Sequence, residues 1–546
     1  MKRLKKSQNI VIATVMVCVL GLLLYFILTS SKPSTAKKPN IIIIIADDLG
    51  YNDVSFHGSS QIPTPNLAKM ATRGIILDRF YTQSTCTPSR TALLTGQYPI
   101  RSGMQGYPLK AGENRSLPLN MPTMPLHFQN LGYKTHLVGK WHLGAAYKED
   151  TPLGKGFDSH FGYWNGFVGY FDYVSFSKMD NGTLVKGLDL HDQFEPVWGS
   201  QGRYATELFT ERSLDVIEGH DVRVPLFLVV SHLAAHTGQN GSELGVPDVD
   251  QTNHEFSYIQ DPRRRLYAGV VSHLDASIGR IMAKLDEKQM LDNSIVLFFS
   301  DNGAQTVGMY ENSGSNWPLR GVKFSDFEGG VRVAATIYSP LFHKKGYVSE
   351  HLIHISDWLP TLYSAAGGDV AHLGQIDGID QWDALTNNNP SNRTEILINI
   401  DEVDENFAII RDKFKLIQGS YHEGTFDQYY GDSGRGPENP TPNPNHTTTD
   451  LSWCRAPDQT PILNCTKGCL FDLDKDPCET TNIIESEPEI ANQLYEKIAQ
   501  FWKELVPQRN KDTDPKSDPI FYNNTWCTWL EDASCHKTTN IERISR

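Results

Sequence analysis

Short apolar runs recur along the chain, and each is followed directly by charged or polar residues. The first, Asn40 to Ala46, reads Asn-Ile-Ile-Ile-Ile-Ile-Ala and shows no polar–apolar alternation. A strand that is apolar on both faces is typical of a parallel sheet covered by helices. Residues 133–140, 225–231 and 293–300 have the length and composition of further strands. The pattern therefore predicts four strands of one central sheet.

Helical patterns lie between these strands. Apolar residues recur at helical spacing around residues 66–73, 89–95 and 266–285. Strands that alternate with helices indicate an α/β fold, with a large and mainly parallel sheet flanked by helices. The composition agrees, because 39% hydrophobic and 21% charged residues allow the chain to bury a sizeable core.

The pattern of predicted elements changes after Asn387-Asn-Asn-Pro390. Residues 407–417 predict two strands around an Asp412-Lys413 turn, and residues 487–505 predict a helix. Between them lies a long polar stretch, residues 430–462. We therefore expect a smaller C-terminal α+β domain with an antiparallel sheet. The predicted parts of the chain are 1–38, 39–394 and 395–546.

The N-terminus has the features of a membrane-targeting segment. Four basic residues within positions 2–6 precede an uncharged, mostly apolar run over residues 10–29. This run just reaches the length that spans a bilayer, whereas the small residues after it would suit a signal peptidase. A retained type II anchor and a cleaved signal peptide both remain open. Either one predicts entry into the secretory pathway, with a lysosomal or extracellular destination.

The cysteines fit an oxidising compartment. Six of the eight lie in the C-terminal fifth of the chain: Cys454, Cys465, Cys469, Cys478, Cys527 and Cys535. We expect disulfides among them, with the pairing left open by the sequence. Zinc is the alternative, but no paired histidines accompany these cysteines. Seven Asn-x-Ser/Thr sequons agree with a glycoprotein: Asn114, Asn181, Asn240, Asn392, Asn445, Asn464 and Asn523.

The net charge of the chain restricts the kinds of molecule that it is expected to bind. A formal charge of −14 argues against nucleic acid as the main partner. An anionic small substrate is still compatible with it, because a local basic pocket can outweigh the field of the whole molecule.

Each predicted strand of the central sheet delivers polar residues at its carboxyl end. In strand order they are Asp47 and Asp48, Lys140 and His142, His232 and His236, and Asp301 and Asn302. The carboxyl ends of parallel strands share one edge of a sheet, where ligands bind in open α/β folds. The carboxylate and amide oxygens suit a hard cation, Ca²⁺ or Mg²⁺. Without a cation between them, three crowded carboxylates would repel one another.

Cys86 lies apart from the C-terminal cysteines, in the segment Cys86-Thr-Pro-Ser-Arg90. This C-x-P-x-R spacing resembles the signature of the sulfatase family, in which the cysteine is oxidised to formylglycine in the endoplasmic reticulum. Other segments that resemble the family are 40–50, 139–144, 301–303 and 470–477. Two stretches are most similar to the arylsulfatase B group, namely 52–58 and 316–330. The resemblance implies the alkaline-phosphatase-like sulfatase fold, with residues 39–394 as the catalytic domain.

The resemblance also implies a role for each site residue. It places one Ca²⁺ on Asp47, Asp48, Cys86, Asp301 and Asn302. Its catalytic set consists of Cys86, Arg90, Lys140, His142, His236 and Lys323. The implied reaction is hydrolysis of a sulfate monoester, in which a hydroxyl of the hydrated aldehyde attacks sulfur and cations stabilise the sulfate oxygens. A formylglycine-generating enzyme is the implied partner during maturation.

Departures from the family pattern concern the substrate. Residues 104–125 carry no cysteine pair, and Thr237-Gly238 follows His236 where Glu-Pro is usual. A sulfated sugar and a small sulfated metabolite such as a glucosinolate both remain open. A phosphoesterase on the related fold is disfavoured by the cysteine, and a non-catalytic binding protein by the complete polar set. His232 is expected to be structural.

Overall fold

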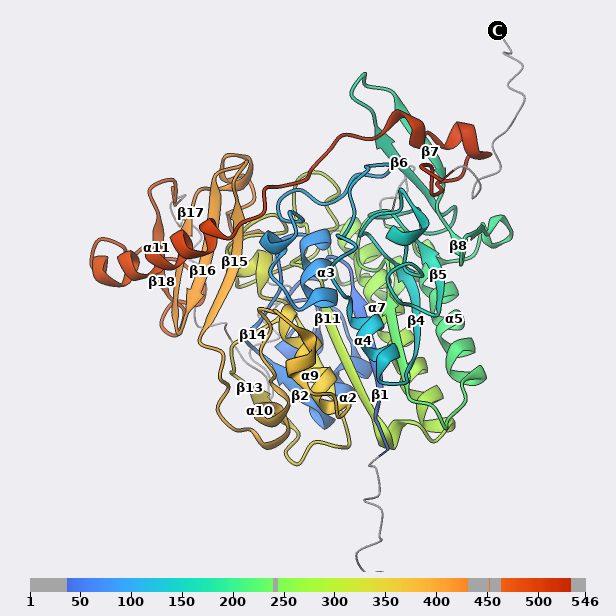
Figure 1. Ribbon diagram of the computed structural model, residues 1–546, viewed down its shortest axis with the longest axis horizontal. Coiled ribbons are helices and arrows are strands. Elements are labelled where there is room, and N and C mark those ends of the chain that lie inside the picture. The colour runs from blue at the N-terminus through green and yellow to red at the C-terminus, as the bar shows by residue number, and fades with distance from the viewer. Residues whose placement is uncertain (1–36, 239–243, 431–450, 452–462, 532–546) are drawn as a thin grey trace, which may run out of the picture. The chain divides into compact units, whose positions relative to one another are not determined.

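The central sheet is parallel in its middle, as the sequence predicts (Figure 1). The computed structural model describes residues 37–238, 244–430, 451 and 463–531. Within them, ten strands lie in the order β13-β2-β12-β11-β1-β10-β4-β5-β8-β9. Their bounds are β1 Asn40–Ala46, β2 Ile75–Leu77, β4 Lys134–Lys140, β5 Ser159–Tyr163, β8 His191–Asp192, β9 Glu195–Pro196, β10 Leu226–Ser231, β11 Ser294–Ser300, β12 Ala335–Tyr338 and β13 Tyr347–Ser349. The strands from β11 to β5 pair in parallel, and β12 runs antiparallel to β11.

Helices cover both faces of this sheet because β1 is apolar on both sides. Ile42 and Ile44 belong to one buried cluster with residues of α2, α5 and α7, whereas Ile41 and Ile43 belong to a second cluster with residues of α3, α4 and α9. The bounds are α2 Pro65–Arg73, α3 Cys86–Thr95, α4 Met124–Asn130, α5 Ala205–Gly219, α6 Val249–Glu255, α7 Pro262–Glu287, α8 Glu328–Val331, α9 Trp358–Ala365 and α10 Trp382–Asn387. The α/β fold class is therefore confirmed.

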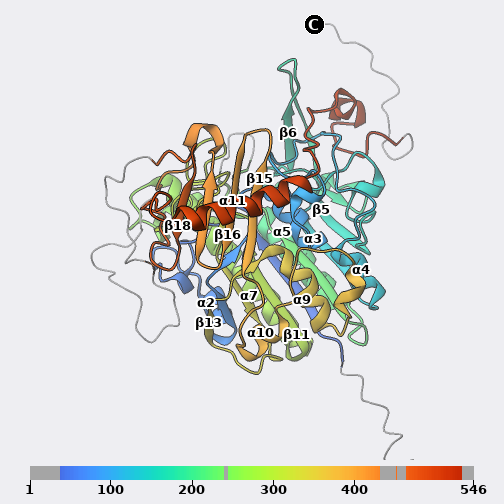
Figure 2. The ribbon, with the colours of Figure 1, turned by 60° about the vertical axis from the view of Figure 1, so that its left-hand side comes forward.

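A second, smaller sheet follows in the C-terminal part, and all its pairings are antiparallel. It consists of β15 Glu395–Asp401, β16 Asn406–Arg411, β17 Phe414–Gln418 and β18 Cys469–Asp472. The predicted turn at Asp412-Lys413 joins β16 to β17. The helix α11, Pro488–Lys503, lies across one face of the sheet (Figure 2) and buries Leu494 and Ile498 against it.

The chain after α11 returns to the main sheet region, where Figure 1 shows it crossing towards β6, Val174–Lys178, and β7, Leu184–Leu188. We call residues 506–517 the C-terminal strap. The amide of Arg509 donates to the Gly103 carbonyl at 3.1 Å, and the amide of Asp514 donates to that of Gly112 at 2.9 Å. The hairpin of β6 Val174–Lys178 and β7 Leu184–Leu188 was not predicted. β15 begins where we expect the second domain to begin, and that division stays a prediction.

No helix among the described residues is long and apolar enough to cross a membrane. The apolar run at residues 10–29 lies outside the described residues, so the choice between anchor and signal peptide stays a prediction.

Two of the described C-terminal cysteines, Cys465 and Cys469, pair with each other in a disulfide, which excludes zinc ligation by this pair. Cys478 and Cys527 are also disulfide-bonded. Cys454 and Cys535 lie outside the described residues. Cys86 is the free cysteine of the described part, and it is buried.

Candidate active site

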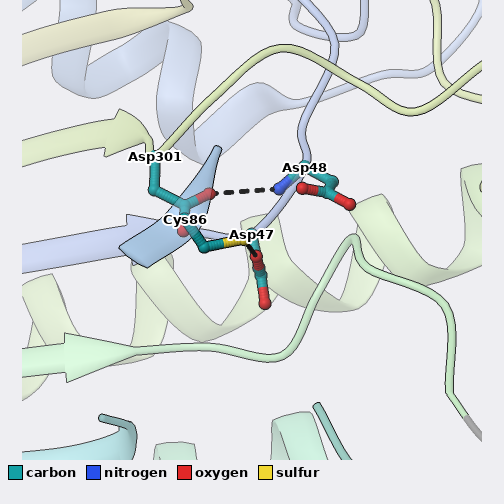
Figure 3. Close-up of side chains that lie close together, drawn as sticks. All are labelled: Asp47, Asp48, Cys86 and Asp301. Carbon is teal, nitrogen blue, oxygen red and sulfur yellow. Dashed lines mark hydrogen bonds between the residues drawn. The ribbon is translucent and has the colours of Figure 1, made fainter. Parts of the chain in front are cut away.

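The edge of the sheet at the carboxyl ends of β1 and β11 gathers four of the predicted site residues (Figure 3). One ligand atom from each of Asp47, Asp48, Cys86 and Asp301 lies within 4.8 Å of the others, and all four side chains are buried. The aspartates follow β1 and β11, which are parallel neighbours. Cys86 is the first residue of α3, so the N-terminus of this helix faces the strand ends.

Each carboxylate of this group has its own basic partner. The shortest distances are 2.7 Å from Lys140 Nζ to Asp47, 2.8 Å from Lys323 Nζ to Asp48 and 2.8 Å from Arg90 Nη2 to Asp301. All six side chains are buried. The fold therefore places three positive side chains of its own against the crowded acids, and a bound cation between these acids stays a prediction. Burial opposes the charge of Lys323, but Asp48 and other acids outweigh it and raise the pKa of this ammonium.

Asn302 offers an additional oxygen that lacks a hydrogen-bond partner. Its Nδ2 donates to Asp48 Oδ1 at 2.6 Å and to the Gly303 carbonyl at 2.9 Å, which fixes the orientation of the amide. Its Oδ1 is buried and accepts no hydrogen bond. A buried acceptor without a partner is costly unless a cation or another group binds it. We call the carboxylates of Asp47, Asp48 and Asp301 and this amide oxygen the oxygen cluster; such a donor set fits Ca²⁺ or Mg²⁺.

The Cys86 thiol lies against this cluster, with Sγ 3.5 Å from Asp47 Oδ1. Burial raises the pKa of the thiol to about 12, although Lys140 and Lys323 act to lower it. The unmodified thiol is thus protonated at neutral pH and is a weak nucleophile. One turn later on α3, Arg90 also donates to Ser231 Oγ at 2.7 Å, so it joins this helix to the end of β10.

A pocket of about 370 Å³ opens onto Cys86, and His142, His236 and Lys323 line it. Arg90 and Lys140 are not among its lining residues. His142 Nε2 lies 2.9 Å from the Leu109 carbonyl and donates to it, while its buried Nδ1 has no hydrogen-bond partner. Burial, with Lys140 nearby, holds the pKa of His142 well below its ordinary value. This imidazole is therefore neutral, with the lone pair on Nδ1.

His236 is placed with the other ring nitrogen towards the cluster. Its Nδ1 lies 2.8 Å from the Thr237 carbonyl, and its Nε2 lies 3.5 Å from Asp48 Oδ2. Burial lowers the pKa of His236, against the opposing influence of Asp48. His232 lies elsewhere: its Nε2 is 3.0 Å from Ser277 Oγ on α7, and the residue does not line the pocket. The structural interpretation of His232 agrees with this position.

The sequence reasoning missed the walls of the pocket. Phe167 stacks on His236 with ring centroids 4.8 Å apart, and Tyr107 stacks on Phe324 at 5.7 Å. Phe324 lies in a stretch that carried the family resemblance, but nothing in the pattern of residues marks it as a wall. Asp512, from the C-terminal strap, also lines the pocket. Its sequence distance from Cys86 leaves no local signal for this contact.

Comparisons with known proteins concern the family and the fold of the chain. The family model described as Sulfatase matches residues 39–368. The chain is 35% identical to mouse (Mus musculus) arylsulfatase J over 92% of this chain and 82% of the relative. It is 30% identical to bovine (Bos taurus) arylsulfatase A over 86% of this chain and 88% of the relative. The crystal structure of Ps i-CgsB is similar with a TM-score of 0.70 at 24% identity, covering 88% of this chain and 95% of that one.

Proposed function

Because the chain belongs to the sulfatase family and is a sulfuric ester hydrolase, we propose that it cleaves sulfate monoesters with a formylglycine made from Cys86 and a calcium ion on the oxygen cluster. The observation that carries this proposal is the convergence of the Cys86 thiol and three carboxylates within 4.8 Å, with Cys86 itself lining a pocket. The orphan Asn302 oxygen supports the metal, because it completes an all-oxygen set that suits a hard cation.

A formylglycine at residue 86 would supply the nucleophilic hydroxyl, and a cation held by the oxygen cluster would supply positive charge. The chain's own cations then divide into two kinds. Lys323 lines the pocket and binds a sulfate oxygen directly. Arg90 and Lys140 lie behind the pocket, where they hold the carboxylates of Asp301 and Asp47 in place.

The two histidines handle protons at defined atoms. His142 accepts a proton at Nδ1, because Leu109 occupies its Nε2 proton and leaves the other nitrogen unpartnered. The Thr237 carbonyl orients His236 so that Nε2 faces the cluster, and this nitrogen donates a proton to the leaving alcohol. A neutral imidazole fits the role of His142 as proton acceptor. The role of His236 requires its imidazole to be protonated before the alcohol departs.

The pocket walls favour a leaving alcohol that contains a ring. The side chains of Tyr107, Phe167, Tyr310 and Phe324 line the pocket, and aromatic faces stack on flat or weakly polar rings. A sulfated sugar and a sulfated metabolite both meet this requirement. The solved structure of BT4656 in complex with its substrate D-glucosamine-2-N,6-O-disulfate is similar to this chain, with a TM-score of 0.57, 20% identity and coverage of 87% of this chain and 100% of that one. At this identity the likeness concerns the fold alone.

Maturation in the secretory pathway is part of the proposal. The disulfide between Cys465 and Cys469 is of the kind that persists in an oxidising compartment. There, a formylglycine-generating enzyme would oxidise Cys86 before α3 is buried, since the folded chain encloses this residue. The arylsulfatase B-like grouping and a lysosomal or extracellular destination are proposed on the same basis.

The decisive experiment combines peptide mass spectrometry with a substrate panel. We expect an aldehyde at residue 86 in protein from the secretory pathway, and hydrolysis of 4-nitrophenyl sulfate that Cys86→Ala abolishes. The panel includes sulfated monosaccharides, a glucosinolate and 4-nitrophenyl phosphate. An unmodified thiol in fully active protein, or faster hydrolysis of the phosphate than of every sulfate ester, would contradict the proposal.

A further inference from the structure

A buried ion pair that the proposed reaction does not use lies beside the active-site pocket. The side chains of Glu113 and Arg115 are each 1% exposed, and Arg115 Nε lies 2.6 Å from Glu113 Oε1. Burying two charges is costly, and a buried pair is retained only where further hydrogen bonds satisfy both partners. The other contacts of this pair therefore indicate what it does.

Those contacts join two segments that are far apart in the sequence. Arg115 donates through Nη2 to the Tyr107 carbonyl at 2.9 Å and through Nη1 to the side chain of Asn510 in the C-terminal strap. Glu113 accepts from the amide of Lys110 at 2.9 Å and from the amide of Lys511 at 2.8 Å. The pair thus fastens the loop formed by residues 107–113 to the strap.

The same loop holds a proposed catalytic histidine. The Leu109 carbonyl accepts from His142 Nε2 at 2.9 Å, and the Leu109 amide donates to Thr87 Oγ1 at 3.1 Å. Thr87 in turn donates to the main-chain carbonyl of His142 at 3.2 Å. Leu109 therefore fixes both the tautomer and the direction of the imidazole, and its own position depends on the loop.

The strap lies outside the part of the chain that matches the family model, which ends at residue 368. It nevertheless contributes Asp512 to the pocket. We propose that Arg115 is a positioning residue for sulfate-ester hydrolysis: with Glu113 it fastens the 107–113 loop to the C-terminal strap and thereby holds the Leu109 carbonyl that orients His142. This inference rests on the proposed function of His142.

The test is a double-mutant cycle on the full-length, formylglycine-bearing protein with 4-nitrophenyl sulfate. In Arg115→Lys, one ammonium cannot replace the three directions of the guanidinium, so the loop should shift. We expect kcat to fall about tenfold in the otherwise native protein, with a smaller change in KM. In the His142→Gln background the same substitution should change kcat less than twofold, because the oriented group is already absent.

Substitution of Asn510 tests the same attachment of the loop to the strap while leaving the buried pair in place. Asn510 is exposed, so its variants should fold. Asn510→Ala removes an acceptor of Arg115 and should lower kcat in a way that also depends on His142. Asn510→Asp keeps an acceptor oxygen at this position and should therefore retain the kcat that Asn510→Ala loses.

Arg393→Lys is the matched control, since Arg393 forms a similarly buried pair with Asp357 whose side chains are 2% and 0% exposed, away from the residues that line the pocket. It should lower the melting temperature without changing kcat in either background. Equal losses of kcat for Arg115→Lys with and without His142 would overturn the inference, as would unchanged kcat in both folded Arg115→Lys and Asn510→Ala. Native kcat in His142→Gln alone would instead contradict the proposed function of His142, and this inference with it.

Discussion

Arg90 and Asp301 face each other inside the site, with Arg90 Nη2 2.8 Å from Asp301 Oδ2 and side chains only 4% and 1% exposed. Arg90 lies one helical turn after Cys86 on α3, and Asp301 follows β11 directly. The pair therefore joins the helix that carries the thiol to a strand that carries a proposed metal ligand. Because both charges are withdrawn from water, neither partner can be lost without leaving the other uncompensated.

Removal of the Arg90 guanidinium should therefore damage both stability and activity. We expect Arg90→Met to lower the free energy of unfolding by about 3–5 kcal/mol, as for other broken buried pairs. Urea denaturation followed by fluorescence measures this change, and the sulfatase assay measures the loss of activity. Arg223→Met is the control, since Arg223 pairs with Asp221 on the surface at 86% and 45% exposure. Its unfolding curve should be indistinguishable from that of the native protein.

Chelation should inactivate the enzyme, and Ca²⁺ or Mg²⁺ should restore activity better than Zn²⁺. Asn302→Leu keeps the volume of the side chain but removes the unpartnered Oδ1, so it should weaken calcium binding measured by titration calorimetry. The control is Asn66→Leu on α2, which should leave calcium binding unchanged. Asn312→Leu is unsuitable as a control, because Asn312 donates to main-chain carbonyls of the site. Full activity after complete metal removal would rule out the metal assignment.

The pH dependence of the free energy of unfolding should include a contribution from Asp326. Burial raises the pKa of this carboxyl from its ordinary 3.8 to about 7, and its Oδ1 has no hydrogen-bond partner. Between pH 4 and about pH 7 the folded chain therefore holds a proton on Asp326 that the unfolded chain lacks. The contribution of this group to stability falls as pH rises through that window.

Asp326→Asn removes this titration while keeping the shape of the side chain. Relative to the native protein, we expect the variant to gain stability between pH 4 and pH 7, as measured by urea denaturation at a series of pH values. Asp215→Asn, on the exposed side of α5, serves as the control and should leave the pH profile unchanged. A stability difference for Asp326→Asn that stays constant from pH 4 to pH 8 would contradict the assignment.

The C-terminal disulfides should protect their thiols. Without prior reduction, Cys465, Cys469, Cys478 and Cys527 should all resist alkylation of the unfolded chain, which mass spectrometry of the peptides can follow. After reduction all four should react. Alkylation of any of them in unreduced protein would argue against the framework inferred from their clustering.

The parts of the fold that could be predicted were those with a local pattern. The run of isoleucines in β1 shows that both faces of the strand are buried, and it also leads directly to Asp47 and Asp48 at the edge where ligands bind. The antiparallel addition of β12 and the β6–β7 hairpin were missed. Both elements are short, and a short apolar segment looks the same whichever way it pairs.

The amino-acid sequence by itself determined the inventory of the site: a cysteine in the Cys86-x-Pro-x-Arg90 spacing, acids at the ends of buried strands, and histidines beyond two others. Only the tertiary structure decided how these groups are balanced and held. Asp48 meets Lys323 across 275 positions of chain, and Arg115 meets Asn510 across 395. Helical and strand periodicities describe neighbours within a few residues, whereas these contacts depend on how distant segments pack, which no local pattern encodes.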